Sequence, residues 1–350
     1  MSLYDSCYSE TIAADDGHPL RVSWFVPDDP RGAVLVAPAM ATPAAFYRPL
    51  ARWLAAAGFL TLTFDYRGTG SVAELKAESA DIVRWAGDAA SALEALVTAA
   101  DGRPVTWLGH SLGGQVLPFA HHGLVDRAFV VASGNGYWRH TVPEVRRRAP
   151  LLWHTLAPAA IAAAGYFPGR RLGIIGDLPA GVMRQWRRWC LSPGYFEADV
   201  PRIRERVAHV TTPLTSVWFT DDELLTVAAV DAMDDLYRGT AVERLRLDPV
   251  AAGVPRVGHH GFFREAAHPL WESVLLPRLA AAPPAEPLPP ASPPAVSPSS
   301  VSPSSVSPSS VPPSTVPPST VPRDPGRPTP RGDAAVTVGA GGSGGGSSAH

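Results

Sequence analysis

Short apolar runs alternate with longer segments of helical spacing along most of the chain, and this alternation limits the possible folds more than any other feature. The helical patterns, over 44–57 and 79–100, stop near glycine or polar residues. The runs that resemble buried strands are AVLVAPA (33–39), FLTLTFDY (59–66), PVTWLGHS (104–111), RAFVVASGNGYW (127–138) and TPLTSVWFTDDE (212–223). The alternation predicts a mostly parallel sheet with helices on both faces.

The rhythm breaks between residues 139 and 205, in a segment rich in arginine and tryptophan. We interpret this segment as a mostly helical cap. The sheet core is then made from residues 1–138 and 206–282. Because the cap follows a strand end, where ligands bind in open α/β sheets, we expect it to influence substrate choice. Trp186 and Trp189 are the candidate substrate-binding residues, as part of an apolar wall.

Residues 283–350 have a different composition. They hold 18 of the 38 prolines and 8 of the 31 glycines, and no aromatic residue. Such a segment buries too little apolar surface to offset the entropy of ordering, so we predict a disordered tail. Its pentapeptide repeats, VSPSS and VPPST, favour polyproline II. A proline-binding domain is the candidate partner for this tail.

Charge and cysteine content exclude several classes of function. The net charge is −2, which argues against a nucleic-acid partner. Two distant cysteines, Cys7 and Cys190, fit free thiols, and the first residues lack a signal-peptide pattern. No run reaches 18 uninterrupted apolar residues, so we expect a cytoplasmic protein without a membrane span. The sequence has no C-x-x-C, H-E-x-x-H or P-loop motif, and we expect neither a metal nor a cofactor.

The segment Gly109-His110-Ser111-Leu112-Gly113 matches G-x-S-x-G between a predicted strand and a predicted helix. In that context the serine sits on a tight turn that exposes its hydroxyl at the sheet edge. The flanking glycines let neighbouring backbone pass closely. Amide groups at the start of the following helix point toward developing negative charge. Ser111 is therefore the candidate nucleophile.

A serine nucleophile needs a base, and the base needs an orienting acid. In this type of fold the acid follows a late strand and the histidine follows the acid. Asp221 and Asp222 follow SVWFT, and His259 and His260 lie in GHHG. We favour Asp222, with Asp221 as the alternative acid, because the next helix has a plausible N-cap at Thr226. We favour His259 as the base because it directly follows Gly258, and we interpret His260 as a packed neighbour.

These motifs, together with FDYRGTGS (64–71), resemble the α/β-hydrolase superfamily over nearly all of residues 10–280. More narrowly, the chain resembles a poorly characterised bacterial group of serine aminopeptidase-like and lysophospholipase-like hydrolases. The resemblance implies a Ser-Asp-His hydrolase whose oxyanion hole is formed by the backbone N–H groups of Met40 and Leu112. It also implies that the turn from Asp65 to Gly68 is structural.

The chain departs from the family pattern at two points. The usual His-Gly pair is missing at Pro38-Ala39-Met40, and Pro118 lies in the helix after the nucleophile. Because proline removes an amide and bends a helix, we expect a kink at Pro118.

Three functions compete for this sequence. The first is hydrolysis of an ester, with an amide as the less favoured bond, in a small or lipid-like acyl substrate. The second is acyl transfer to an acceptor other than water at the same site. The third is a non-enzymatic scaffold that acts through the proline-rich tail, against which the complete set of Ser, Asp and His argues.

Overall fold

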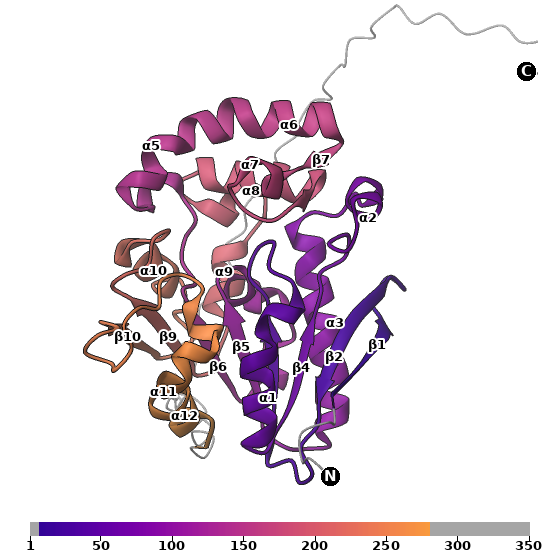
Figure 1. Cartoon of the computed structure of the whole chain (residues 1–350), viewed down its shortest axis with the longest axis vertical. Helices are drawn as coiled ribbons and strands as arrows, with labels where there is room; N and C mark the ends of the chain where they lie inside the picture. Colours follow the sequence, from indigo (N-terminus) through magenta and orange to yellow (C-terminus); the bar gives the residue numbers. More distant parts are fainter. Residues whose placement is uncertain (1–6, 281–350) are drawn as a thin grey trace, which may run out of the picture. The chain divides into compact units, whose positions relative to one another are not determined.

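The computed structural model describes residues 7–280, so the predicted tail lies outside the described residues. In this part of the chain the main sheet has eight strands in the order β1-β2-β4-β3-β5-β6-β9-β10 (Figure 1). The strands are β1 Cys7–Ala13, β2 Pro19–Phe25, β3 Gly32–Ala37, β4 Phe59–Phe64, β5 Val105–His110, β6 Arg127–Val131, β9 Leu214–Phe219 and β10 Val242–Leu247. From β4 to β10 neighbouring strands are parallel, which confirms the predicted sheet.

The first two strands form a hairpin and run antiparallel to each other. Gly17 lies in its turn with φ of +80°, a conformation that glycine adopts without steric cost. Strand β2 also pairs antiparallel with β4, so the hairpin extends one edge of the parallel sheet.

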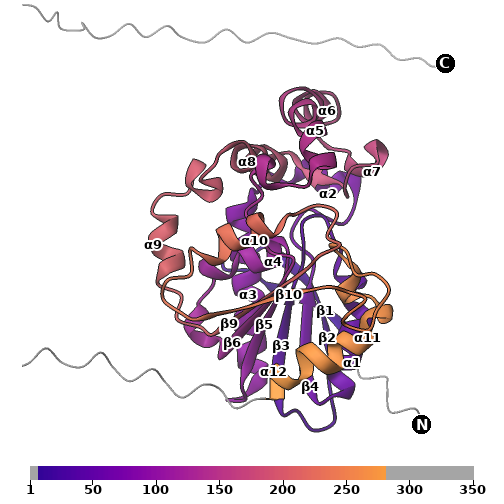
Figure 2. The same cartoon turned by 90° about the vertical axis from the view of Figure 1, so that its left-hand side faces the viewer.

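Two hydrophobic cores cover the two faces of the sheet, and strand β3 contributes to both. Val34 and Val36 belong to one core, whereas Leu35 belongs to the other, as expected from the alternation of side chains along a strand. The helices α1 and α12 cover the first face and α3 covers the second (Figures 1 and 2). The helices outside the cap are η1 Ala44–Tyr47, α1 Arg48–Ala56, α2 Val72–Ala77, α3 Ile82–Ala100, α4 Leu112–Gln115, η2 Leu117–Phe119, η3 His122–Leu124, α10 Val227–Asp234, η7 Gly261–Phe263, η8 Glu265–Ala267, α11 His268–Leu270, η9 Trp271–Leu275 and α12 Leu276–Ala280.

The helix after Ser111 is broken at Pro118, where we predicted a kink. Helix α4 ends at Gln115, and a separate 3-10 turn, η2, follows. Pro118 has no N–H to donate to the Gly114 carbonyl, so an α-helix cannot continue through it with its normal bonds. The Tyr237 hydroxyl donates to that carbonyl at 3.5 Å instead.

The cap segment, residues 139–205, is mostly helical and lies above the strand ends in Figure 1. Its elements are η4 Trp138–His140, α5 Pro143–Leu151, η5 Leu152–Leu156, α6 Ala157–Ala164, β7 Tyr166–Phe167, α7 Gly169–Leu172, β8 Leu178–Pro179, α8 Ala180–Leu191, η6 Tyr195–Ala198 and α9 Ile203–Ala208. The last helix, α9, extends beyond the predicted end of the cap at residue 205. None of the helices among residues 7–280 is both long and apolar enough to cross a membrane.

A buried amide joins the cap to the core. The Gln185 carbonyl oxygen in α8 accepts hydrogen bonds from Ile82 N at 2.7 Å and from Val83 N at 3.1 Å, at the first turn of α3. These two N–H groups have no partner within their own helix, so a cap side chain satisfies the start of a core helix. Gly181 lies against the same place, since a Cβ there would be 2.3 Å from the Ala80 carbonyl oxygen.

Candidate active site

Ser111 lies at the carboxyl end of β5, on the turn into α4, and has a strained backbone. Its φ is 49° and its ψ is −111°, which is rare for a residue with a side chain. Two buried side chains fix the turn from the β6 side. The Ser133 hydroxyl donates to the Ser111 carbonyl at 2.9 Å, and the Gln115 amide donates to the Gly134 carbonyl at 2.8 Å. Neither residue carries a sequence signal that would have marked it in advance.

The two glycines of the motif are required by close backbone contacts. A Cβ at Gly113 would be 1.9 Å from the Ala37 carbonyl oxygen, at the end of the neighbouring strand β3. A Cβ at Gly109 would be 2.6 Å from both Gly114 Cα and Gly114 N, across the turn. The turn that carries Ser111 is therefore packed directly against the backbone of β3.

We expect Gly113→Ala to lower the free energy of unfolding by about 3 kcal/mol or more and to cost most of the activity, because backbone must move to admit the methyl group. Urea denaturation and ester hydrolysis measure the two effects. The matched control is Gly123→Ala, on the surface, where a Cβ would meet nothing within 4 Å. That control should stay within about 0.5 kcal/mol of the wild type. Equal stability of the two variants would contradict the packing argument.

The structure joins Asp222 to the ring of His259. Asp222 Oδ2 and His259 Nδ1 are 2.9 Å apart, and both side chains are buried. The other carboxylate oxygen, Oδ1, accepts from Leu224 N at 2.8 Å and from Leu225 N at 2.9 Å. These contacts fix the carboxylate in the loop after β9 and aim one oxygen at the imidazole.

Asp221, the alternative acid, contacts the backbone of the histidine loop instead of the ring. It accepts from Val257 N and Gly258 N, both at 2.9 Å. Glu223 accepts from His259 N at 3.0 Å. Three consecutive acids after β9 thus hold one loop, and sequence reasoning missed the contribution of Glu223. Its position directly after the two aspartates was the available signal.

His260 packs beside the site without a carboxylate on its ring. Its imidazole lies edge-on to Phe46 and to His110, with ring centroids 6.1 Å and 5.1 Å away. Burial, and secondarily the charge of His259, lower the pKa of His260 to about 4. This ring is therefore neutral at pH 7, as a packed neighbour would be.

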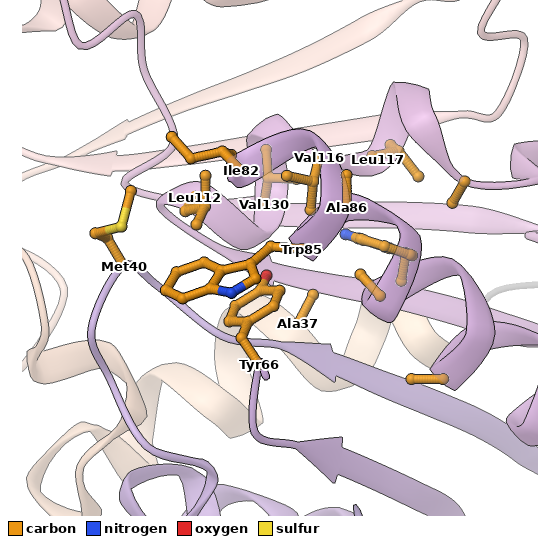
Figure 3. Close-up of a cluster of buried hydrophobic side chains, with 14 of the residues drawn as sticks. Ala37, Met40, Tyr66, Ile82, Trp85, Ala86, Leu112, Val116, Leu117 and Val130 are labelled. Carbon is orange, nitrogen blue, oxygen red and sulfur yellow. The ribbon is translucent and has the colours of Figure 1, made fainter. Parts of the chain in front are cut away.

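Met40 and Leu112, whose amides we predicted to form the oxyanion hole, both have buried side chains. Figure 3 shows the two side chains at one end of a hydrophobic cluster, near Ile82 and Trp85. Among the described residues, neither backbone N–H has a hydrogen-bond partner. Both amides are thus free to donate, and their role in an oxyanion hole stays a prediction.

The serine and the histidine are not hydrogen-bonded to each other in this structure. Within residues 7–280 no bond of 3.5 Å or less joins Ser111 Oγ to His259 Nε2. Ser111 is half-buried, and His259 follows at the end of the loop after β10. Catalytic hydrogen bonds are often long before substrate binds and shorten in the complex.

The two candidate tryptophans pack inside the cap. Trp189 is fully buried and its indole N–H donates to Asp199, so it offers no surface to a ligand in this structure. Trp186 is half-buried and lies edge-on to Trp153, with ring centroids 5.1 Å apart. Trp186 keeps some exposed surface, and its role in substrate choice stays a prediction.

The turn from Asp65 to Gly68 is structural, as we predicted. Asp65 accepts from Ala44 N at 2.8 Å, and Arg67 donates to Asp88 at 2.8 Å and to Asp16 at 2.7 Å. These contacts tie together the turns after β1, β3 and β4. Within the described part of the chain, no group of three histidine, cysteine or acidic side chains is placed to hold a metal.

Comparison with solved structures identifies the fold. The structure of DcsB in complex with its substrate analogue matches 73% of this chain and 92% of its own, at 17% identity and a TM-score of 0.50. The chain has the α/β-hydrolase fold. A second similar structure, the α/β hydrolase GrgF from Penicillium sp. sh18, covers 78% of this chain and 96% of its own, at 20% identity and a TM-score of 0.48. The predicted fold class is thus confirmed.

A sequence family model also matches part of the chain. The serine aminopeptidase S33 family model matches residues 28–160, a range that includes Ser111 and ends before Asp222 and His259. No curated protein matches the chain in sequence. The family match and the α/β-hydrolase fold together support hydrolase activity, and the roles of the individual residues depend on the geometry described above.

Proposed function

We propose that this α/β hydrolase cleaves a carboxylic ester in a small or lipid-like substrate through Ser111, Asp222 and His259. The observation that carries the proposal is the buried 2.9 Å contact between Asp222 and His259 Nδ1, beside a serine on a strained turn. An imidazole held in this way has its Nε2 free to accept a proton, which is the state that a general base requires.

In the proposed reaction, Ser111 Oγ attacks the ester carbonyl carbon while His259 Nε2 takes the hydroxyl proton. Asp222 keeps the Nδ1–H tautomer and stabilises the imidazolium that forms. The N–H groups of Met40 and Leu112 donate to the oxyanion. His259 then returns the proton to the leaving alcohol, and the C–O bond of the ester breaks. Water hydrolyses the resulting acyl-enzyme by the same proton transfers.

The hydrogen bonds of the three acidic residues after β9 favour an ester substrate over the peptide substrate of an aminopeptidase. An aminopeptidase must recognise a free α-ammonium group, for which a nearby carboxylate is the natural partner. Asp221, Asp222 and Glu223 are each already hydrogen-bonded to the loop that carries His259. Their carboxylates thus have a role in building the site, and the proposed ester needs none of them for substrate binding.

A panel of p-nitrophenyl esters and aminoacyl anilides tests this proposal. We expect turnover of the esters, with faster cleavage than for any anilide. Faster cleavage of an aminoacyl anilide would replace the ester assignment by an aminopeptidase assignment. Added alcohol as a second acceptor separates hydrolysis from acyl transfer, because a transferase forms the new ester in preference to the free acid.

A further inference from the structure

His110, the variable residue of the G-x-S-x-G motif, lies in a buried chain of hydrogen bonds. Its Nε2 is 2.9 Å from the His259 carbonyl oxygen, and its Nδ1 is 2.8 Å from the Tyr47 hydroxyl. The same hydroxyl accepts from Ala39 N at 2.8 Å. Both side chains are fully buried. None of these hydrogen bonds takes part in the proposed proton transfers. The two at the ends of the series, however, are made to the backbone of segments that carry proposed catalytic groups.

The donor and the acceptor of each hydrogen bond in this series can be assigned without ambiguity. A carbonyl oxygen only accepts, so the hydrogen of His110 must be on Nε2, where it points at the His259 carbonyl. In the neutral ring Nδ1 then accepts, and the Tyr47 hydroxyl must donate to it. The Tyr47 oxygen in turn accepts the Ala39 N–H. Burial lowers the pKa of His110 well below its usual value, which keeps the ring in this neutral form.

The chain of bonds connects the two halves of the proposed catalytic apparatus. One end is the backbone of His259, the base, whose N–H is already held by Glu223. The other end is the amide of Ala39, directly before the proposed oxyanion donor Met40. Between them, His110 directly precedes the nucleophile on β5.

We propose that His110 and Tyr47 are positioning residues that set the distance between the His259 loop and the Met40 amide. They touch no reacting atom and act through the backbone that carries the base and the oxyanion donor. This inference rests on the proposed function, because it assigns these segments their catalytic roles. Such a connection matters because misplacement of a catalytic group by about 1 Å can cost roughly 100-fold in rate.

The test compares kcat and KM for p-nitrophenyl acetate, with kcat expressed per active site titrated by a fluorophosphonate. We expect Tyr47→Phe and His110→Leu each to lower kcat per site by about 10- to 100-fold, with KM changed less than about threefold. The double variant should resemble the more impaired single variant, because both changes break one chain of bonds. His110→Gln should recover most of the rate, since its amide has one donor group and one acceptor atom.

A purely structural role would reduce the number of titrated sites and the melting temperature without changing kcat per site. Tyr66→Phe is the matched control, because its buried hydroxyl donates to the Pro38 carbonyl at 3.2 Å in the same loop but lies outside the chain of bonds. We expect its kcat loss to be several times smaller than that of Tyr47→Phe. Wild-type kcat per site in Tyr47→Phe, an equal loss in Tyr66→Phe, or losses that multiply in the double variant would each overturn the inference.

The wild-type protein gives a test that does not depend on how well any variant folds. Nitrogen NMR of its histidine rings should show His110 neutral and protonated at Nε2, with a slowly exchanging ring proton. A ring protonated at Nδ1 would overturn the inference. Failure of the proposed function is distinguishable, because the wild type itself would then neither react with the fluorophosphonate nor cleave the ester.

Discussion

Asp222→Asn should lower kcat by about 10⁴-fold, because the substituted amide would hold His259 in the wrong tautomer. Asp222 Oδ1 accepts from two backbone amides, Leu224 N and Leu225 N. An asparagine must therefore turn its oxygen toward them and its NH₂ group toward His259 Nδ1. The NH₂ group donates to Nδ1, which leaves the hydrogen on Nε2, and the imidazole cannot accept the serine proton. Steady-state ester hydrolysis measures the effect.

Asp221→Asn is the matched comparison for that variant. It weakens two hydrogen bonds to the backbone of the histidine loop and leaves the tautomer of His259 unchanged. We expect a loss of about tenfold or less, mainly through a looser loop. If Asp221→Asn instead showed the large loss of kcat, Asp221 would be the acid that orients His259 and Asp222 would have the structural role. If neither variant were impaired, the acid would lie elsewhere on the sheet.

Ser111→Ala should abolish covalent labelling by a fluorophosphonate and lower turnover by about 10³-fold or more. In the proposed reaction the Ser111 hydroxyl oxygen forms the acyl-enzyme, and alanine has no hydroxyl to replace it. Mass spectrometry of the labelled protein identifies the modified residue, and ester hydrolysis gives the rate.

Ser133→Ala is a suitable control for this variant, since Ser133 also carries a buried hydroxyl near the turn. Its hydroxyl donates to the Ser111 carbonyl and would not become acylated, so labelling should persist. Undiminished labelling of Ser111→Ala would remove Ser111 from the mechanism and with it the proposed function.

The sequence predicted those parts of the fold and site that depend on local pattern. The alternation of strand and helix patterns predicted the sheet, because the spacing of apolar residues indicates which side chains are buried. The glycines at 109 and 113 indicated a close backbone approach, and the structure supplies the Ala37 carbonyl as the reason for the second. The order of serine, acid and histidine predicted Ser111 and Asp222 at strand ends and His259 on a late loop, which is where the structure has them.

Contacts between distant segments could not be predicted in this way. The bonds of Gln185 to the start of α3, and of His110 to Tyr47 and His259, join residues 63 to 149 positions apart along the chain, with no pattern linking them. Trp189 shows the same limit, because its aromatic character fits a substrate wall and a packed core equally well. The choice between the two followed from its burial.

Pro118 has an electrostatic consequence. In a long helix the aligned peptide dipoles add up to a partial positive charge at the first turn. Helix α4 covers four residues, from Leu112 to Gln115, and its summed macrodipole is that of a single turn. In the proposed reaction, the field at the oxyanion then comes mainly from the two proposed donors, the N–H groups of Leu112 and Met40. The proposed mechanism therefore implies that stabilisation of the transition state is short-ranged and depends on the positions of these two amides.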